Sequence, residues 1–571
     1  MRSSSPPVSA AAAAAAVCLA LAAHAPSVAH AVVYDVGPGM PYATIGDVPW
    51  ESLVAGDNVR IHWQAAAYHE KLVLAVHGTA AAPIVVEGVP GPGGELPVID
   101  GANATTRSAL NFWNEERGLV KIGGANTPSS ELGEWIVLSG LELRGARDTT
   151  TFTGRAGTPT SYNSNAAAVF IEHGEHVTVR NCIIADSGNG LFVSPASVDI
   201  HVERNHIVGN GNPGSFYEHN VYSEALGITF EGNWLEPLCS GCGGNNLKDR
   251  SAGTIIRYNW IDGGNRALDL VDAEDSATLV ADASYRDTWV YGNVMIERDD
   301  TGNSQVVHFG GDSGTTSDYR PMLHFYANTI VSYRPGNTTL FRLSSPGQTA
   351  EVIGNVLYDM TGGARLAILD SDGDVTLSAN WLSSGWNDSF SGLAGTITDS
   401  GDNVEGATPS FADLASQDFR LADGSPCIDH GRLASGAMPV IGEYLKHLST
   451  TTRAMDATID IGAFEHGTVP ADGGVAPPPS DGGVAPGTDG GVTPGTDGGL
   501  PPGTDGGVAP RTDGSAASAD GGGSDSTVDG GCGCVVAGGR QRAGPRVTPA
   551  ALVLFAGLLG AAAFRATRRQ R

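Results

Sequence analysis

One motif recurs through the middle of this 571-residue chain: a short β-branched or aromatic run, an asparagine, and a second apolar pair. Runs this short, separated by turns rich in glycine and asparagine, indicate strands rather than helices. The gaps between successive asparagines are 24 to 35 residues, shorter on average than a β-propeller blade of about 40 residues. The eight asparagines are Asn181, Asn205, Asn233, Asn259, Asn293, Asn328, Asn355 and Asn380.

A repeat of this length fits one coil of three short strands plus a loop. Coils stacked at about 4.8 Å form parallel sheets around one apolar core. Asparagine at a recurrent corner tolerates the left-handed conformation and can stack as an amide ladder. We therefore predict an all-β fold, a single-stranded right-handed parallel β-helix (a solenoid), over residues 32–466. The segments GPGMPYATI…GDNVRIH and SPCIDHG…DIGAFEH resemble the first coil and the closing segment of bacterial β-helix proteins.

The two ends of the chain have a different composition. Residues 1–31 contain Arg2, an Ala-rich apolar run and the small-residue site Ala29-His30-Ala31, which predicts a signal peptide. Residues 467–531 repeat the unit GGVxPGTD and offer almost nothing to bury, which predicts a disordered Gly/Pro/Asp-rich stalk. In residues 532–571 an apolar run at 547–564 is just long enough for a transmembrane helix, and arginines follow it.

The order Cys532-Gly533-Cys534, apolar helix and arginine cluster resembles the myxobacterial sorting tail called MYXO-CTERM. The resemblance implies cleavage near Cys532 by a C-terminal sorting protease, with membrane contact through the tail only. We therefore expect an exported protein at the bacterial cell surface or outer membrane, or extracellular after tail processing.

Charge and cysteines narrow the possible partners. The formal net charge of −29 disfavours nucleic acid, and a polyanionic ligand would need a local basic patch. Cys239-Ser-Gly-Cys242 has metal-ligand spacing, but no second Cys or His pair lies at zinc-finger distance. A small loop disulfide suits an exported chain better than a metal site.

The asparagine register places side chains on the outside of the coils. Counting back twelve residues from Asn205, Asn233 and Asn259 gives apolar inward positions, and their next neighbours point outward. The predicted outward column is Ser194, Tyr222, Lys248 and Asp269, and a weaker alignment adds His308. Asn220 and Asn246 flank it on one side, and Glu224 and Arg250 on the other. Insertions at 272–287 and 299–303 could wall a groove beside it. The alternative is a set of ordinary cross-strand ion pairs.

The stretch NNLKDRSAGTIIRYNWIDGGNRALDL resembles β-helical polysaccharide lyases of the chondroitinase B and alginate lyase kind. Lys248 matches their catalytic lysine, whereas their following arginine falls near Asp269 here. A broader class of bacterial β-helix proteins shares the pattern HN[IV]Y…K.R[SA], carried by 219–222 and 248–251.

The lyase resemblance implies β-elimination, in which Ca²⁺ or arginine neutralises a uronate carboxylate and a base removes the acidified proton. Lys248 and Arg250 are the predicted catalytic residues, and Lys248, with its pKa lowered by Arg250 and burial, is the predicted base. Asp269 and Asp272 are a possible calcium site, and Tyr222 or His219 would protonate the leaving oxygen. The predicted substrate-binding residues are His219, Asn220, Tyr222, Asn246, Arg266 and His308.

The leading hypothesis from sequence is a cell-surface polysaccharide lyase, or lyase-like protein, acting on an acidic, uronate-containing glycan. The first alternative is a non-catalytic glycan-binding or adhesion β-helix. The second is a glycoside hydrolase, which needs paired carboxylates. Of the β-helical polygalacturonase signatures, only the DD pair Asp299-Asp300 is present.

Overall fold

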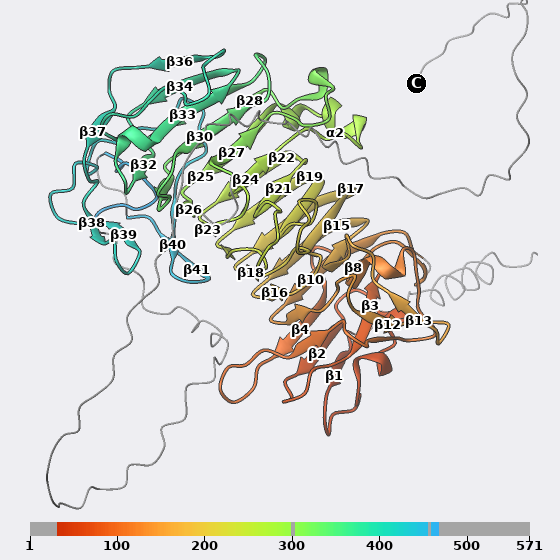
Figure 1. Ribbon diagram of the computed structural model, residues 1–571. Coiled ribbons are helices and arrows are strands. Elements are labelled where there is room, and N and C mark those ends of the chain that lie inside the picture. The colour runs from red at the N-terminus through yellow and green to blue at the C-terminus, as the bar shows by residue number, and fades with distance from the viewer. Residues whose placement is uncertain (1–30, 129, 299–302, 455–457, 468–571) are drawn as a thin grey trace, which may run out of the picture. The chain divides into compact units, whose positions relative to one another are not determined.

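The computed structural model describes residues 31–128, 130–298, 303–454 and 458–467 (Figure 1). The predicted sorting tail, nearly all of the predicted stalk and signal peptide, and the Asp299-Asp300 pair lie outside the described residues. None of the helices in the described part is long and apolar enough to cross a membrane.

The described chain is a parallel β-helix, as predicted. One face of its coils is built from short strands that pair in parallel with the next coil. These strands are β3 (Glu70–Leu74), β8 (Gly118–Ile122), β14 (Ala167–Ile171), β17 (Asn189–Glu203), β19 (Val221–Glu231), β21 (Leu247–Asp249), β24 (Leu268–Leu270), β27 (Gln305–Phe309), β30 (Thr338–Leu343) and β33 (Leu366–Ser371).

The long strands β17 and β19 bend into the second face and join both faces in one 24-stranded sheet. The second face contains β1 (Val33–Val36), β2 (Asn58–His62), β4 (Ile84–Val89), β10 (Gly133–Ser139), β15 (Gly174–Arg180), β22 (Ala252–Arg257), β25 (Asp287–Tyr291), β28 (Met322–Tyr326), β31 (Thr349–Ile353), β34 (Asp374–Ser378) and β36 (Thr396–Asp399). Five further short strands belong to loops near the N-terminal coils. Three of them are members of the 24-stranded sheet: β6 (Thr105–Thr106), β12 (Thr151–Thr153) and β13 (Pro159–Ser161). The other two, β7 (Asn111–Phe112) and β9 (Ala125–Thr127), pair with each other.

A separate 11-stranded parallel sheet forms the third face. It contains β5 (Val98–Asp100), β11 (Glu142–Arg144), β16 (Ile183–Ala185), β18 (His206–Val208), β20 (Trp234–Leu235), β23 (Trp260–Asp262), β26 (Val294–Glu297), β29 (Thr329–Ser332), β32 (Val356–Asp359), β35 (Trp381–Ser383) and β37 (Val404–Gly406). The α-helix α2 (Ala277–Ala281) lies in the loop between β24 and β25.

The core runs through the coils as stacked apolar side chains. On the first face, the register pairs Leu191, Val221, Leu247, Leu268 and Val307 on successive strands, and all five are fully buried. Because alternate residues of a strand point to opposite sides, this inward column fixes an outward column one residue along.

The predicted amide ladder is present at the corner before the 11-stranded sheet. Each side-chain amide donates to the amide oxygen of the next coil at 2.9–3.1 Å, from Asn205 through to Asn403. Sequence reasoning missed Asn403 and was wrong about Asn181, because Cys182 occupies the ladder position in that coil and donates its N–H to Asn205. The left-handed backbone conformation is adopted by the residue that directly precedes a ladder asparagine, for example Arg204 (φ 51°) and Tyr258 (φ 54°).

Asn259→Ala should destabilise the protein by about 3 kcal/mol, because it leaves a buried backbone N–H and carbonyl unpaired. The Asn259 amide oxygen accepts from the Asn233 backbone, and its nitrogen donates to the Phe230 carbonyl. Urea unfolding followed by circular dichroism measures the change. Asn403→Ala, at the half-exposed end of the ladder, is the control and should cost less. Equal losses in both variants would contradict a ladder stabilised by burial.

The C-terminal segment folds back along the 11-stranded sheet rather than only closing its end. It carries the hairpins β38 (Phe411–Asp413) with β39 (Asp418–Leu421), and β40 (Gly442–Leu445) with β41 (Ser449–Thr452) (Figure 1). Trp260 of β23 stacks on Phe419 at 5.4 Å between ring centroids, and Trp234 stacks on His447 at 4.0 Å. This aromatic cover lies on the third face, and the site described next lies on the first face.

Candidate functional site

An outward column of side chains crosses the first face next to the inward column. The strand register places Tyr222, Lys248, Asp269 and His308 on adjacent strands, in the order that the sequence predicts. It continues to Arg342 on β30, which sequence reasoning missed. Ser194 was wrongly assigned to this column, because Phe192 pairs with Tyr222 and the register then shifts between Val193 and Ser197.

The column forms the floor of an open cavity of about 760 Å³. Its walls come from the loop after β18, with Phe216 and Tyr217, and from the loop after β27, with 311–314 and Tyr319. Phe216 and Tyr217 are 62% and 56% exposed, so two aromatic rings are open to solvent at the rim. The insertion at 272–287 does not line the cavity, contrary to prediction.

Lys248 is bound by two carboxylates. Its Nζ donates to Oδ2 of Asp312 at 2.7 Å and lies 3.4 Å from Oδ2 of Asp269. Burial alone would lower the pKa of Lys248, but these two charges outweigh it and raise the pKa above its ordinary value. The predicted role of Lys248 as a base of lowered pKa is therefore wrong for this arrangement.

Arg250 is fully buried below the cavity and does not line it. Its Nε donates to the Tyr222 hydroxyl oxygen at 2.9 Å, and its Nη2 donates to Oδ1 of Asp312 at 2.8 Å. Its Nη1 donates to the backbone carbonyl of Asp272. Arg250 is thus out of reach of a substrate, which corrects its predicted catalytic role, and it fixes Tyr222 and Asp312 instead.

Asn220 and Asn246 form a second, shorter amide ladder inside the coils. The Asn220 amide donates to Oδ1 of Asn246 at 2.8 Å, and Asn246 donates to the Asp262 carbonyl at 2.9 Å. Both are fully buried and absent from the cavity lining. Their predicted contact with substrate is therefore wrong, and they are corner residues of the fold.

The carboxylates expected to bind calcium already have other donors. Asp269 accepts from Asn245 and His308, both at 2.7 Å, and its pKa is well below the ordinary value because Lys248 and His308 outweigh burial. Asp272 is fully buried and accepts the N–H of Asp312 at 2.9 Å. Cationic neighbours repel a second cation, so this donor set does not fit Ca²⁺. In the described ranges no group of three or more His, Cys, Asp or Glu is placed for a metal ion.

His308 is oriented from both ring nitrogens. Nδ1 lies 2.7 Å from Oδ1 of Asp269, which can only accept, so Nδ1 carries the proton. Nε2 then accepts from the hydroxyl of Ser344 at 2.9 Å. Burial lowers the pKa of His308 despite the Asp269 charge, so the imidazole is neutral at neutral pH. A neutral histidine held by a carboxylate has the arrangement that can act as a general base.

His219 lies in the cavity wall against Tyr222, with ring centroids 6.0 Å apart. Its Nδ1 accepts the backbone N–H of Asn245 at 2.9 Å, so the proton of the neutral ring is on Nε2. Burial, with the Lys248 charge second, lowers the pKa of His219 to about 3. It can donate a hydrogen bond to a ligand but does not carry a charge at neutral pH.

Two arginines add positive charge to the cavity. Arg266 lines the cavity and donates from Nη2 to Oε1 of Gln305 at 2.9 Å. Arg342 is half-buried, lines the cavity, and has no hydrogen-bond or ion-pair partner among the described residues. On a chain with a net charge of −29, an unpaired guanidinium in a cavity is a site for an anion.

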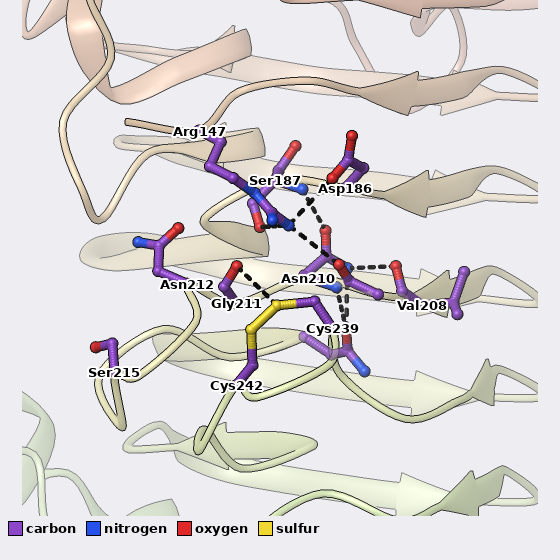
Figure 2. The surroundings of a disulfide bond; sticks show 12 residues. Arg147, Asp186, Ser187, Val208, Asn210, Gly211, Asn212, Ser215, Cys239 and Cys242 are labelled. Atoms are coloured by element: carbon purple, nitrogen blue, oxygen red, sulfur yellow. Dashed lines mark hydrogen bonds and ion pairs between the residues drawn. A yellow bond between two sulfur atoms is a disulfide. The ribbon is translucent and has the colours of Figure 1, made fainter. Parts of the chain in front are cut away.

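The predicted disulfide joins Cys239 and Cys242 (Figure 2). The loop that it closes pairs with the chain leading to the aromatic rim. Gly214 donates to the Gly241 carbonyl at 2.7 Å, and Gly243 donates to the Ser215 carbonyl at 2.8 Å. The disulfide loop therefore supports the segment that ends in Phe216 and Tyr217.

The raised pKa of Glu224 predicts that the stability of the protein depends on pH. Burial, with Asp275 second, raises the pKa of its carboxyl to about 8. The unfolded chain loses this proton near pH 4.5 and the folded chain near 8, so stability should fall by about 1.4 kcal/mol per pH unit in between. Glu224→Gln should remove this slope from pH-dependent urea unfolding. A slope unchanged in the variant would show that another group causes it.

The comparisons with known proteins bear on the fold. The family model described as "Right handed beta helix region" matches residues 152–294. No curated protein matches the sequence. Similar solved structures include an alginate lyase from Paenibacillus sp. str. FPU-7, with 13% identity, TM-score 0.38, and 53% of this chain and 89% of that one covered.

Two further structures are the pectate lyase Pel9A (12% identity, TM-score 0.39, 76% of this chain and 96% of that one) and a rhamnogalacturonan lyase (13%, 0.42, 71% and 97%). Identities and TM-scores this low support no transfer of activity. The matched family region includes Tyr222, Lys248 and Asp269, so the coils that carry most of the column are similar to right-handed β-helix coils.

Proposed function

We propose that the cavity binds an acidic, uronate-containing polysaccharide and cleaves it by β-elimination. The observation that carries the proposal is the unpaired Arg342 next to the neutral His308 on the adjacent strand. An anion site beside a general base is the minimum that this reaction needs. The exposed rings of Phe216 and Tyr217 give a sugar chain an apolar surface at the rim.

The steps follow from the protonation states. Arg342, with Arg266 also in the cavity lining, binds the uronate carboxylate and acidifies the adjacent C–H. His308 takes that proton at Nε2, since the Ser344 hydroxyl can donate to the Phe309 carbonyl at 3.2 Å instead. The C–H electron pair forms the C=C bond as the glycosidic C–O bond breaks. His308 then returns this proton from Nε2 to the leaving oxygen, because Tyr222 lies three strands away along the column, at about 4.8 Å per strand.

A glycoside hydrolase finds less support. The cavity contains two carboxylates, Asp269 and Asp312. The charge of Lys248 outweighs burial and lowers the pKa of both, and Arg250 adds to this at Asp312. Hydrolysis needs one of the pair protonated as the general acid, and both are ionised at neutral pH.

Glycan binding without cleavage is the second candidate, favoured by the full pairing of Lys248 with Asp312 and Asp269. In that case the cavity would recognise the same acidic chain through Arg342 and the aromatic rim. Binding and turnover must therefore be measured separately.

Arg342→Gln tests the anion site. We expect affinity for a uronate polymer in calorimetric titration to fall about tenfold to a hundredfold, because a charge-assisted contact is lost. A carboxyl-reduced sample of the same polymer should bind wild type and variant equally weakly. Arg286→Gln, outside the cavity lining, is the matched control. Equal binding of the uronate polymer by wild type and Arg342→Gln would contradict the proposal.

We propose further that the protein is exported and held at the bacterial surface, with the stalk as spacer and the tail removed by a sorting protease. The support is the sequence of residues 1–31 and 467–571 alone. Mass spectrometry of the mature surface protein should find a C-terminus near Cys532. A mature chain that retains 547–564 would contradict tail removal.

A further inference from the structure

Ser344, His308 and Asp269 form a hydrogen-bonded series inside the cavity. Asp269 Oδ1 lies 2.7 Å from His308 Nδ1, and His308 Nε2 lies 2.9 Å from Ser344 Oγ. All three residues line the same cavity. They come from three successive coils, on β24, on β27 and directly after β30, so the register of the β-helix brings them together.

We propose that Ser344 is a nucleophile that removes short acyl esters from sugar hydroxyl groups bound in this cavity. A serine next to a histidine that a carboxylate orients is the arrangement that activates a hydroxyl for acyl transfer. This activity goes beyond β-elimination and does not depend on it, because it needs no uronate.

Two local features support a reactive hydroxyl at this position. The Ser344 oxygen also accepts the backbone N–H of Gly311 at 3.1 Å, which holds it toward His308. Arg342 is two residues earlier, near the end of β30, and lines the same cavity as Ser344. Its unpaired guanidinium can donate to the oxygen that becomes negative when the ester carbonyl is attacked.

The reaction balances without a further reactant besides water. The Ser344 O–H proton moves to His308 Nε2 as Oγ bonds to the acyl carbon, and the carbonyl pair moves to oxygen. When that pair returns, the bond to the sugar oxygen breaks, and His308 gives it the proton. Water, deprotonated by His308, then attacks the acyl-serine, which releases the carboxylic acid and restores the Ser344 hydroxyl.

The test uses the purified full chain and a fluorophosphonate probe, which bonds covalently to activated serines. Peptide mass spectrometry should find the adduct on Ser344 and not on Ser313, a second cavity serine that donates to Asp272. Labelling should persist below the ordinary histidine pH range, because the pKa of His308 is lowered. Absence of the adduct from Ser344 in folded wild-type protein would overturn the proposal, and this measurement needs no variant.

Hydrolysis of p-nitrophenyl acetate is the second readout. Ser344→Ala should lower the rate of this hydrolysis by at least about a thousandfold. A cooperative thermal unfolding transition near that of the wild type shows that the variant is folded. A folded Ser344→Ala protein with wild-type hydrolysis would also overturn the assignment. Failure of the proposed β-elimination gives a different result from failure of the esterase proposal. In that case no unsaturated uronate product forms, but the probe still labels Ser344.

Discussion

His308→Gln should lower the rate of uronate-polymer cleavage by at least about a hundredfold to ten-thousandfold, the range that a general base contributes. Glutamine keeps a hydrogen-bonding side chain next to Asp269 but cannot take a proton. Because burial lowers the pKa of His308, wild-type activity should continue below the ordinary histidine range and fall only when the ring is protonated. Initial rates across pH measure both effects.

The matched control is His324→Gln. His324 is also paired with carboxylates, Glu351 at 3.0 Å and Asp287 at 2.9 Å, but it lies on β28, outside the cavity. Its replacement should leave the rate unchanged. Full activity of His308→Gln, with the polymer still bound, would remove His308 as the base.

Asp312→Ala should destabilise the protein by about 3 kcal/mol, near the low end of the usual cost of breaking a buried ion pair, because Lys248 keeps Asp269 at 3.4 Å. Asp312 accepts from Lys248 at 2.7 Å and from Arg250 at 2.8 Å, and both cations are buried. The variant should also weaken the cavity wall at 311–314. Urea unfolding gives the free energy, and Asp318→Ala, in the same loop but outside the lining, is the control.

Lys248→Met combined with Asp312→Ala tests the cause of that loss. Removing Lys248 as well should recover part of the stability, since that buried cation no longer lacks its nearest carboxylate. If the double variant is as unstable as the sum of the single ones, the pairing of Lys248 and Asp312 does not stabilise the site.

The sequence allowed the column to be predicted where strand lengths stay regular. The spacing of the asparagines predicted the register of Tyr222 and Lys248, because one corner residue per coil aligns successive strands, and the alternation at 267–270 added Asp269. The same count failed at Ser194, since the register between β17 and β19 shifts between Val193 and Ser197. An irregularity inside a strand leaves no mark in the asparagine spacing.

Arg342 could have been found by the same reasoning. It lies between Phe341 and Leu343, as His308 lies between Val307 and Phe309, so the alternation extends the column by one coil. Asp312 had only a weak signal, the Gly-Gly-Asp-Ser-Gly turn after His308. It lies 64 residues from Lys248 in the chain, and no periodicity connects a loop residue to a strand.

Protonation states were the least predictable part. The sequence shows Lys248 near Arg250, which suggested a lowered pKa. The structure adds two carboxylates to the same ammonium group, and their charges outweigh both burial and Arg250. Which effect wins depends on distances of a few ångströms that no spacing in the sequence specifies.

The most direct test of the account is ultraviolet absorbance of unsaturated uronate product during incubation with alginate, pectate and chondroitin. We predict a rise with at least one polymer that continues after chelation of Ca²⁺ and disappears in His308→Gln. Binding of these polymers with no unsaturated product from any of them would contradict β-elimination and leave the cavity as a glycan-binding site.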